Sequence, residues 1–325
     1  MKVILVALRP LIALAFVQWC ASVPAQDYPA RPVHIIAATP PGGPVDLVAR
    51  LMAQKLSEVY GRPVVVENRA GAGGAIGADH VAKSQPDGYT LLVASPATLC
   101  IAPAIRPKLP YDPIKDFAPI SITTIAAFML VVHPSLPAKS VRELIALARA
   151  KPGQLDYAST GSGTFTHLSM ELFKSMARVE IVHVPYSGAA PAITDLISGR
   201  MQMLVNAVAT TQPHLKSGKL RGLAVTGAKR SALMPELPTM SEAGVTGYEA
   251  TNWFGLAARA GTPREIVASL NAALGKSFNT ADTKEKMLAQ GLELTLTTPD
   301  NFARIIRDEV SKWAKVVKVS GAIVD

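Results

Sequence analysis

The chain alternates short apolar runs with longer segments in which apolar residues recur every three or four positions. Short runs are typical of buried strands and the longer segments of amphipathic helices, so the pattern indicates an α/β fold with mainly parallel sheets. The first unit is an apolar run at 33–38, a turn at 39–44 and a helix that ends before Gly61 and Pro63. The remaining strands are predicted at 63–67, 89–94, 129–132, 155–158, 181–184, 201–205 and 220–225.

Capping residues mark several predicted helix starts. Ser140 and Glu143 form a capping box, and residues 262–265 indicate a second box with proline at the first helical position. The pair 298–299 opens the last helix in a similar way. Further helices are predicted at 75–83 and near Thr166, Ala189 and Thr211.

Two blocks of this α/β pattern indicate two lobes. A proline-rich stretch at 103–113 precedes one crossing between the lobes, and the loop 234–247 precedes the other. We therefore predict lobe one from 27–125 plus 251–325 and lobe two from 126–250.

The first 25 residues differ from the rest. Lys2 and Arg9 precede an apolar run at 11–17, and Ala25 provides a small residue for cleavage, which together predict a secretory signal peptide. The run is too short for a membrane span, which needs about 20 residues. We expect export to the periplasm, with lipid attachment at Cys20 as the minor alternative.

Composition narrows the function classes. The chain has 325 residues, of which 49% are hydrophobic and 18% charged, so it is large enough to bury one or two cores. The formal charge of +9 falls to +7 if Lys2 and Arg9 are removed, but the cations are scattered, which disfavours nucleic acid and favours anionic solutes. The six histidines show no metal-ligand spacing, and we expect neither a metal nor another cofactor.

Ligands of open α/β sheets bind beyond the carboxyl ends of the strands, where one turn of this chain is rich in proline and glycine. Its glycines expose backbone N–H groups, and the helix that follows directs its positive end at the same place, which suits an anion. A plain tight turn is the alternative. The candidate ligand-binding residues here are Thr39, Pro41, Gly42, Gly43 and Asp46.

A second strand-to-helix turn, at 159–167, is rich in hydroxyl groups and glycine, and a third follows at 185–189. Such a segment offers a carboxylate several neutral donors, although an ordinary solvated loop has the same composition. The candidates in lobe two are Ser159, Gly161, Ser162, Gly163, Thr164, His167, Tyr186, Ser187 and Asn206.

The sequence disfavours two enzyme interpretations. Residues 71–77 follow a strand and open a helix like a dinucleotide-binding turn, but Ile76 stands where the fingerprint has its third glycine. No Gly-x-Ser-x-Gly elbow occurs in the sequence. The remaining alternative is a periplasmic enzyme that uses His167 with a serine or threonine of its loop.

Nine segments, in order along the mature chain, resemble the Bug-type periplasmic receptors of tripartite tricarboxylate transporters. They are Tyr28-Pro29 with Arg31-Pro32, Pro41-Gly42-Gly43, Val66-Glu67-Asn68-Arg69, Gly71-Ala72-Gly73-Gly74, Pro86-Asp87-Gly88-Tyr89, Tyr111-Asp112-Pro113, Val184-Pro185-Tyr186, Leu223-Ala224-Val225-Thr226 and Ala260-Gly261-Thr262-Pro263. The resemblance implies a two-lobed type II periplasmic-binding-protein fold with the ligand between the lobes, and it makes the turn at 71–77 structural. Asn206 and Val45 depart from the family pattern, in which many relatives have Asp and Thr.

These observations together predict a non-enzymatic receptor for a small carboxylate. We expect a monomer that hands its ligand to inner-membrane transporter subunits or reports it to a sensor protein. The identity of the acid is left open, because an amino acid, a dicarboxylate and an aromatic acid present the same carboxylate to such loops.

Overall fold

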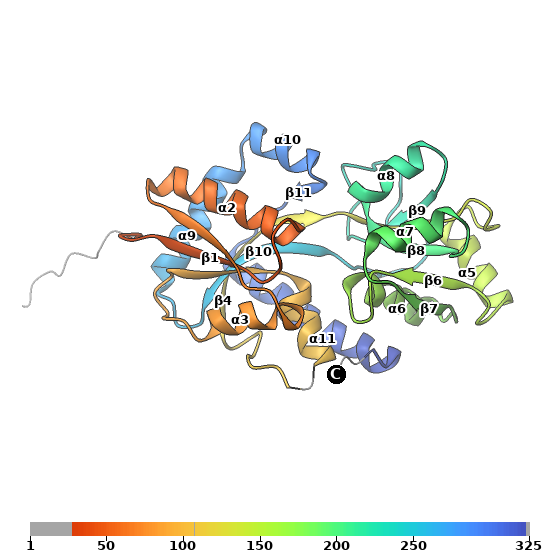
Figure 1. The fold of residues 1–325 in the computed structure, drawn as a ribbon, viewed down its shortest axis with the longest axis horizontal. Coiled ribbons are helices and arrows are strands. Elements are labelled where there is room, and N and C mark those ends of the chain that lie inside the picture. Colours follow the sequence, from red (N-terminus) through yellow and green to blue (C-terminus); the bar gives the residue numbers. More distant parts are fainter. Residues whose placement is uncertain (1–27, 107, 323–325) are drawn as a thin grey trace, which may run out of the picture.

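A computed structural model describes residues 28–106 and 108–322 of the chain, so the predicted signal peptide and Cys20 lie outside the described residues. Two lobes lie side by side, each built on its own sheet (Figure 1). No helix in the described ranges is long and apolar enough to cross a bilayer.

The larger lobe contains a six-stranded sheet in the order β11-β4-β10-β3-β1-β2. The strands are β1 (Val33–Ala37), β2 (Val64–Asn68), β3 (Thr90–Ala94), β4 (Phe117–Ala126), β10 (Asn252–Arg259) and β11 (Leu292–Leu294). The α-helices are α2 (Pro44–Tyr60), α3 (Ala75–Ala82), α4 (Ala102–Ile105), α9 (Arg264–Phe278), α10 (Ala281–Ala289) and α11 (Pro299–Ser320). One buried cluster, which contains Ile35, Leu56, Leu256 and Phe278, packs α2 and α9 against this sheet.

The smaller lobe contains a five-stranded sheet in the order β7-β6-β8-β5-β9. Its strands are β5 (Phe128–Val132), β6 (Asp156–Ser159), β7 (Val182–Pro185), β8 (Met203–Ala207) and β9 (Arg221–Val225). Its helices are α5 (Val141–Ala150), α6 (Phe165–Ala177), α7 (Ala189–Ile197) and α8 (Val208–Lys216). Helix α11 of the larger lobe reaches this lobe, where Trp313 meets Phe165 edge-on with ring centroids 6.0 Å apart (Figure 1).

The α/β fold class is as predicted, and both sheets are mixed: most strands of each sheet run in one direction, and antiparallel strands interrupt them. Strands β2 and β3 pair with β1 in parallel, whereas β10 is antiparallel to β3 and β4. In the smaller lobe β6 is parallel to β7 and β8, while β5 is antiparallel to β8 and β9. The antiparallel strands β5 and β10 are those that enter from the other lobe. They begin at the edge where the neighbouring strands end, so they run in the opposite direction.

Two of the three predicted capping sites are confirmed. The hydroxyls of Ser140 and Thr298 each accept a hydrogen bond from the backbone N–H three residues on. The box predicted at 262–265 is wrong, because the Thr262 hydroxyl donates to the Arg259 carbonyl at 2.7 Å and α9 begins at Arg264. Helix α8 begins at Val208, three residues before the predicted start.

Candidate functional site

The turn between β1 and α2 lies at the edge of the larger lobe where the chain crosses to the smaller one. Strand β4 leaves this sheet at Ala126, which pairs with Asn252 at the start of β10. Because β10 is antiparallel to β3, the carboxyl ends of β3 and its parallel neighbour β1 lie at this same edge. The turn at 39–44 therefore faces the smaller lobe (Figure 1).

The candidate loops of the smaller lobe lie at the matching edge. Strand β5 enters at Phe128, which pairs with Ala207 at the end of β8. Strands β6, β7 and β8 are parallel, so the loop at 159–164 and the turn at 185–189 also lie at the entering edge. The structure thus brings the three predicted turns to facing edges of the two lobes, as expected of a site between them.

The carboxylate of Asp46 shapes the first turn from inside. Its oxygens accept hydrogen bonds from the Gly42 N–H at 3.0 Å, Arg50 Nε at 3.0 Å and Asn68 Nδ2 at 2.9 Å. Asp46 is 4% exposed, and these donors, Arg50 first, lower the pKa of its carboxyl to about 2. Asp46 is therefore ionised and holds the turn in place. The Gly42 N–H already donates to Asp46 and is not free for a ligand.

Other groups of the first turn keep their hydrogen-bonding capacity. Thr39 Oγ1 is buried and has no hydrogen-bond partner among the described residues, although the Thr39 carbonyl accepts from Asn68 Nδ2 at 3.2 Å. Gly43 is the N-cap of α2, a helix of 17 residues. Because glycine has no side chain, it offers no acceptor to the first N–H groups of that helix. Pro41 is exposed beside them. A buried polar atom without a partner is costly, and a ligand oxygen would satisfy Thr39.

The second loop holds itself together through its hydroxyl groups. Thr164 caps α6 by accepting from the His167 N–H, and its hydroxyl donates to the Gly161 carbonyl at 2.7 Å. Ser159 Oγ accepts from the Gly161 N–H at 3.1 Å. Ser162, at the tip, is exposed. The loop is therefore preformed, with the Ser162 hydroxyl available.

His167 lies beneath this loop rather than beside a nucleophile. Its Nδ1 accepts a hydrogen bond from the Gly163 N–H at 3.0 Å, and the side chain is buried. Burial, followed by the nearby ring of His183, lowers the pKa of His167 to about 4. Through this hydrogen bond His167 holds the loop. No serine or threonine hydroxyl in the described ranges donates to either of its ring nitrogens.

Of the remaining candidate residues in the smaller lobe, some already form hydrogen bonds within the protein. The Tyr186 hydroxyl donates to Asp195 Oδ2 at 2.9 Å, while Ser187 next to it is exposed. Asn206, 3% exposed near the end of β8, donates from Nδ2 to Thr210 Oγ1 at 3.1 Å. Burial, followed by Asp195, raises the pKa of Tyr186, so the phenol is neutral and acts as a donor.

Two residues that hold these loops were not among the predicted site residues. Asn68, at the end of β2, donates hydrogen bonds to the Thr39 carbonyl and the Asp46 carboxylate. Its position at the end of a parallel strand is a sequence signal that could have identified it. His183, in β7, lies 2.6 Å from Ser159 Oγ through its Nε2. No local pattern marks His183, because its loop partner lies 24 residues earlier.

The turn at 71–77 packs against the strand that leads into the first turn. A side chain at Gly77 would lie 2.8 Å from Ala38 Cβ and 2.9 Å from the Arg69 carbonyl oxygen. These glycines therefore allow close packing of α3 on β1, as the interpretation of a structural turn requires.

A Gly77→Ala substitution is expected to lower the free energy of unfolding by about 2 kcal/mol, because the added methyl group overlaps backbone atoms of Ala38. Urea unfolding measures the change. Gly275→Ala is the matched control, since a side chain there meets no atom within 4 Å and alanine favours the interior of α9, so stability should rise slightly. Equal stability of both variants would contradict the packing role of Gly77.

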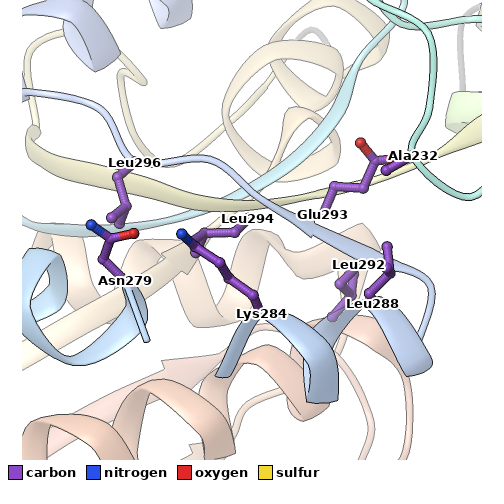
Figure 2. Close-up of a pocket in the computed structure, with 8 residues that line it drawn as sticks. All are labelled: Ala232, Asn279, Lys284, Leu288, Leu292, Glu293, Leu294 and Leu296. Carbon is purple, nitrogen blue, oxygen red and sulfur yellow. The ribbon is translucent and has the colours of Figure 1, made fainter. Parts of the chain in front are cut away.

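Two described pockets lie away from these loops. One, of about 470 Å³, lies between α10 and β11 and is lined mainly by leucines, with Lys284, Asn279 and Glu293 at its rim (Figure 2). The other, of about 430 Å³, lies beside the crossing segments and includes Phe128, Thr226 and Trp253. Neither contains a predicted ligand-binding residue. In the described ranges, no group of three His, Cys, Asp or Glu side chains is placed to bind a metal ion.

Two α/β lobes joined by crossing strands, with preformed loops of neutral donors at their facing edges, define a solute-binding receptor. Residues 48–322 match the model of the tripartite tricarboxylate transporter family receptor, and the chain belongs to this family. The family consists of binding receptors rather than enzymes.

Individual relatives agree with this assignment. Protein BugT of Bordetella pertussis is 39% identical over 303 residues, which cover 93% of each chain. The R. palustris protein Rpa4515, solved with adipate, is 39% identical, with a TM-score of 0.76 over 92% of this chain and 100% of that one. The periplasmic binding protein BugD is 32% identical, with a TM-score of 0.71 over 91% of this chain and 99% of its own.

Proposed function

We propose that this protein is a periplasmic receptor that binds a small carboxylate, such as a dicarboxylate, between its lobes and catalyses no reaction. Its first 25 residues direct export, and the monomeric receptor presents its ligand to inner-membrane transporter subunits. A relative of 39% identity has been solved with adipate, which supports the ligand class.

The observation that carries this proposal is the arrangement of neutral donors at the facing edges. Thr39 Oγ1, buried without a partner among the described residues, lies at the first turn, and the exposed hydroxyls of Ser162 and Ser187 lie on the opposite lobe. Hydrogen bonds to a charged group contribute about 1.5–3 kcal/mol each. A carboxylate that receives donors from both lobes would favour the closed arrangement.

A thermal-shift screen of the exported chain against mono- and dicarboxylates tests the ligand class. A ligand at 100 times its dissociation constant is expected to stabilise the protein by about 2.7 kcal/mol. A shift with neutral sugars only would contradict the proposal. Recovery of a chemically altered acid after incubation would favour the enzyme alternative at the loop 159–167.

Thr39→Val tests the first turn separately. Valine keeps the shape but removes the hydroxyl, so the affinity for the carboxylate is expected to fall about tenfold, with little change in stability. Thr124→Val is the matched control, because Thr124 Oγ1 is also buried without a partner in the described ranges but lies within β4. Isothermal titration calorimetry measures both variants. Equal affinity of Thr39→Val and the unmodified protein would exclude Thr39 as a ligand contact.

A further inference from the structure

Two histidine rings lie stacked beneath the loop at 159–164. His167 of α6 and His183 of β7 have ring centroids 3.8 Å apart and planes 9° from parallel. His167 Nδ1 accepts from the Gly163 N–H at 3.0 Å, and His183 Nε2 is 2.6 Å from Ser159 Oγ. The two rings therefore hold the loop at its beginning and near its end.

These contacts specify the protonation of His167. A ring nitrogen that accepts a hydrogen bond from a backbone N–H carries no proton, so neutral His167 has its proton on Nε2. A second proton on Nδ1 would place two N–H groups against each other at Gly163. Burial and the neighbouring His183 ring lower the pKa of His167, and burial also lowers the pKa of His183.

Among the groups that face the two rings, Glu171 favours a positive charge, but the burial of the rings outweighs it. Glu171 Oε1 is 3.9 Å from His167 Nε2, but the same oxygen accepts hydrogen bonds from Lys174 Nζ at 2.6 Å and from the Tyr157 hydroxyl. Tyr157 of β6 also stacks on His183, with centroids 4.9 Å apart. The carboxylate beside the histidines is therefore already balanced by Lys174, and protonation of the rings would add an uncompensated charge.

We propose that His167 and His183 are positioning residues, which hold the loop 159–164 in its binding conformation only while both rings are neutral. A proton on His167 Nδ1 removes the acceptor for the Gly163 N–H, and a second proton on His183 adds repulsion between the stacked rings. The loop then shifts, and ligand is released in acid. This inference rests on the proposed carboxylate site, but its first test needs no ligand.

Nuclear magnetic resonance of the ligand-free protein labelled with ¹⁵N-histidine tests the protonation state. The expected spectrum shows His167 with an unprotonated Nδ1 and a proton on Nε2, unchanged from pH 8 to pH 5. Below pH 5 the Gly163 amide signal is expected to move together with the His167 titration. A proton on Nδ1, titration near the ordinary value of about 6.5, or a Gly163 signal independent of His167 would overturn the proposal.

His183→Gln separates positioning through protonation from simple packing. Glutamine can still reach Ser159, but it removes one source of repulsion, so the pKa of His167 rises. The affinity for adipate is expected to weaken about threefold at pH 8 and about twofold more, relative to the unmodified protein, by pH 5. Comparison at each pH cancels the protonation of adipate itself.

The control is His133→Gln, whose ring contacts Ser135 at the surface of the smaller lobe and should leave the pH profile unchanged. Parallel pH profiles of His183→Gln and the unmodified protein would reduce the pair to a packing role and overturn the inference. Failure of any carboxylate to bind the unmodified protein at pH 8 would instead refute the proposed function, whereas the magnetic resonance result on the ligand-free loop would stand.

Discussion

Replacing Asp46 with alanine is expected to abolish measurable carboxylate binding and to lower the free energy of unfolding by about 3 kcal/mol. The substitution removes the carboxylate that accepts from the Gly42 N–H, the Asn68 amide and Arg50 Nε, and a hydrogen bond to a charged group contributes about 1.5–3 kcal/mol. The turn at 39–44 then loses the group around which it folds. Calorimetric titration with the best carboxylate of the screen and urea unfolding measure the two effects.

Asp46→Asn is the matched variant, because it keeps one acceptor oxygen but removes the charge that binds Arg50. We expect binding to weaken less than in the alanine variant. Binding by Asp46→Ala at the strength of the unmodified protein would show that the first turn is not part of the site.

The pH dependence of stability provides an independent readout. The pKa of Asp46 is lowered from its ordinary value of 3.8 to about 2 in the folded protein, so its contribution of about 2 kcal/mol is complete above pH 3.8. It is lost as the pH falls through 2, because both states are then protonated. The stability difference between the unmodified protein and Asp46→Asn should therefore shrink in that range.

The sequence predicted the positions of the candidate turns better than the hydrogen bonds that those turns make. Strand β1 is mainly apolar, the last three residues of β6 are buried, and both strands are followed by Gly-rich turns, so their carboxyl ends could be located from local pattern. The partners of each donor depend on groups distant in the chain. Gly42 was expected to offer its N–H to a ligand, but Asp46 accepts it, and the acceptor of the Gly163 N–H is the ring of His167.

The strand that returns from the smaller lobe was also hard to predict, because its position depends on residues far away in the sequence. In β10 the six residues from Trp253 to Ala258 are all buried, and the strand contains Gly255, so it has neither alternation nor a helical period. Its place was set by long-range packing, since a side chain at Gly255 would lie 2.7 Å from the ring of Phe302 on α11. Strand β11 pairs with β4 and has three residues, which is too short a pattern to detect from the sequence.

Glu309 of α11 lies where the strand that returns from the smaller lobe meets the C-terminal helix. Its carboxylate, 5% exposed as a residue, accepts from the indole N–H of Trp253 at 3.3 Å and of Trp313 at 3.2 Å, and from Lys312 Nζ at 3.0 Å. Trp253 begins the strand that returns from the smaller lobe, and Trp313 contacts Phe165 at the start of α6. The carboxylate thus joins the returning strand to the helix that reaches the second binding loop.

Glu309→Ala is expected to lower the free energy of unfolding by about 4 kcal/mol, because it leaves two buried indole donors without an acceptor and opens a cavity between them. Urea unfolding followed by tryptophan fluorescence measures the loss. Glu309→Gln keeps an acceptor oxygen and should cost less than half as much. Asp308→Ala, at an exposed neighbour paired with Arg304, should change stability by less than about 0.5 kcal/mol. Similar losses in Glu309→Ala and Asp308→Ala would show that the paired indoles do not depend on this carboxylate.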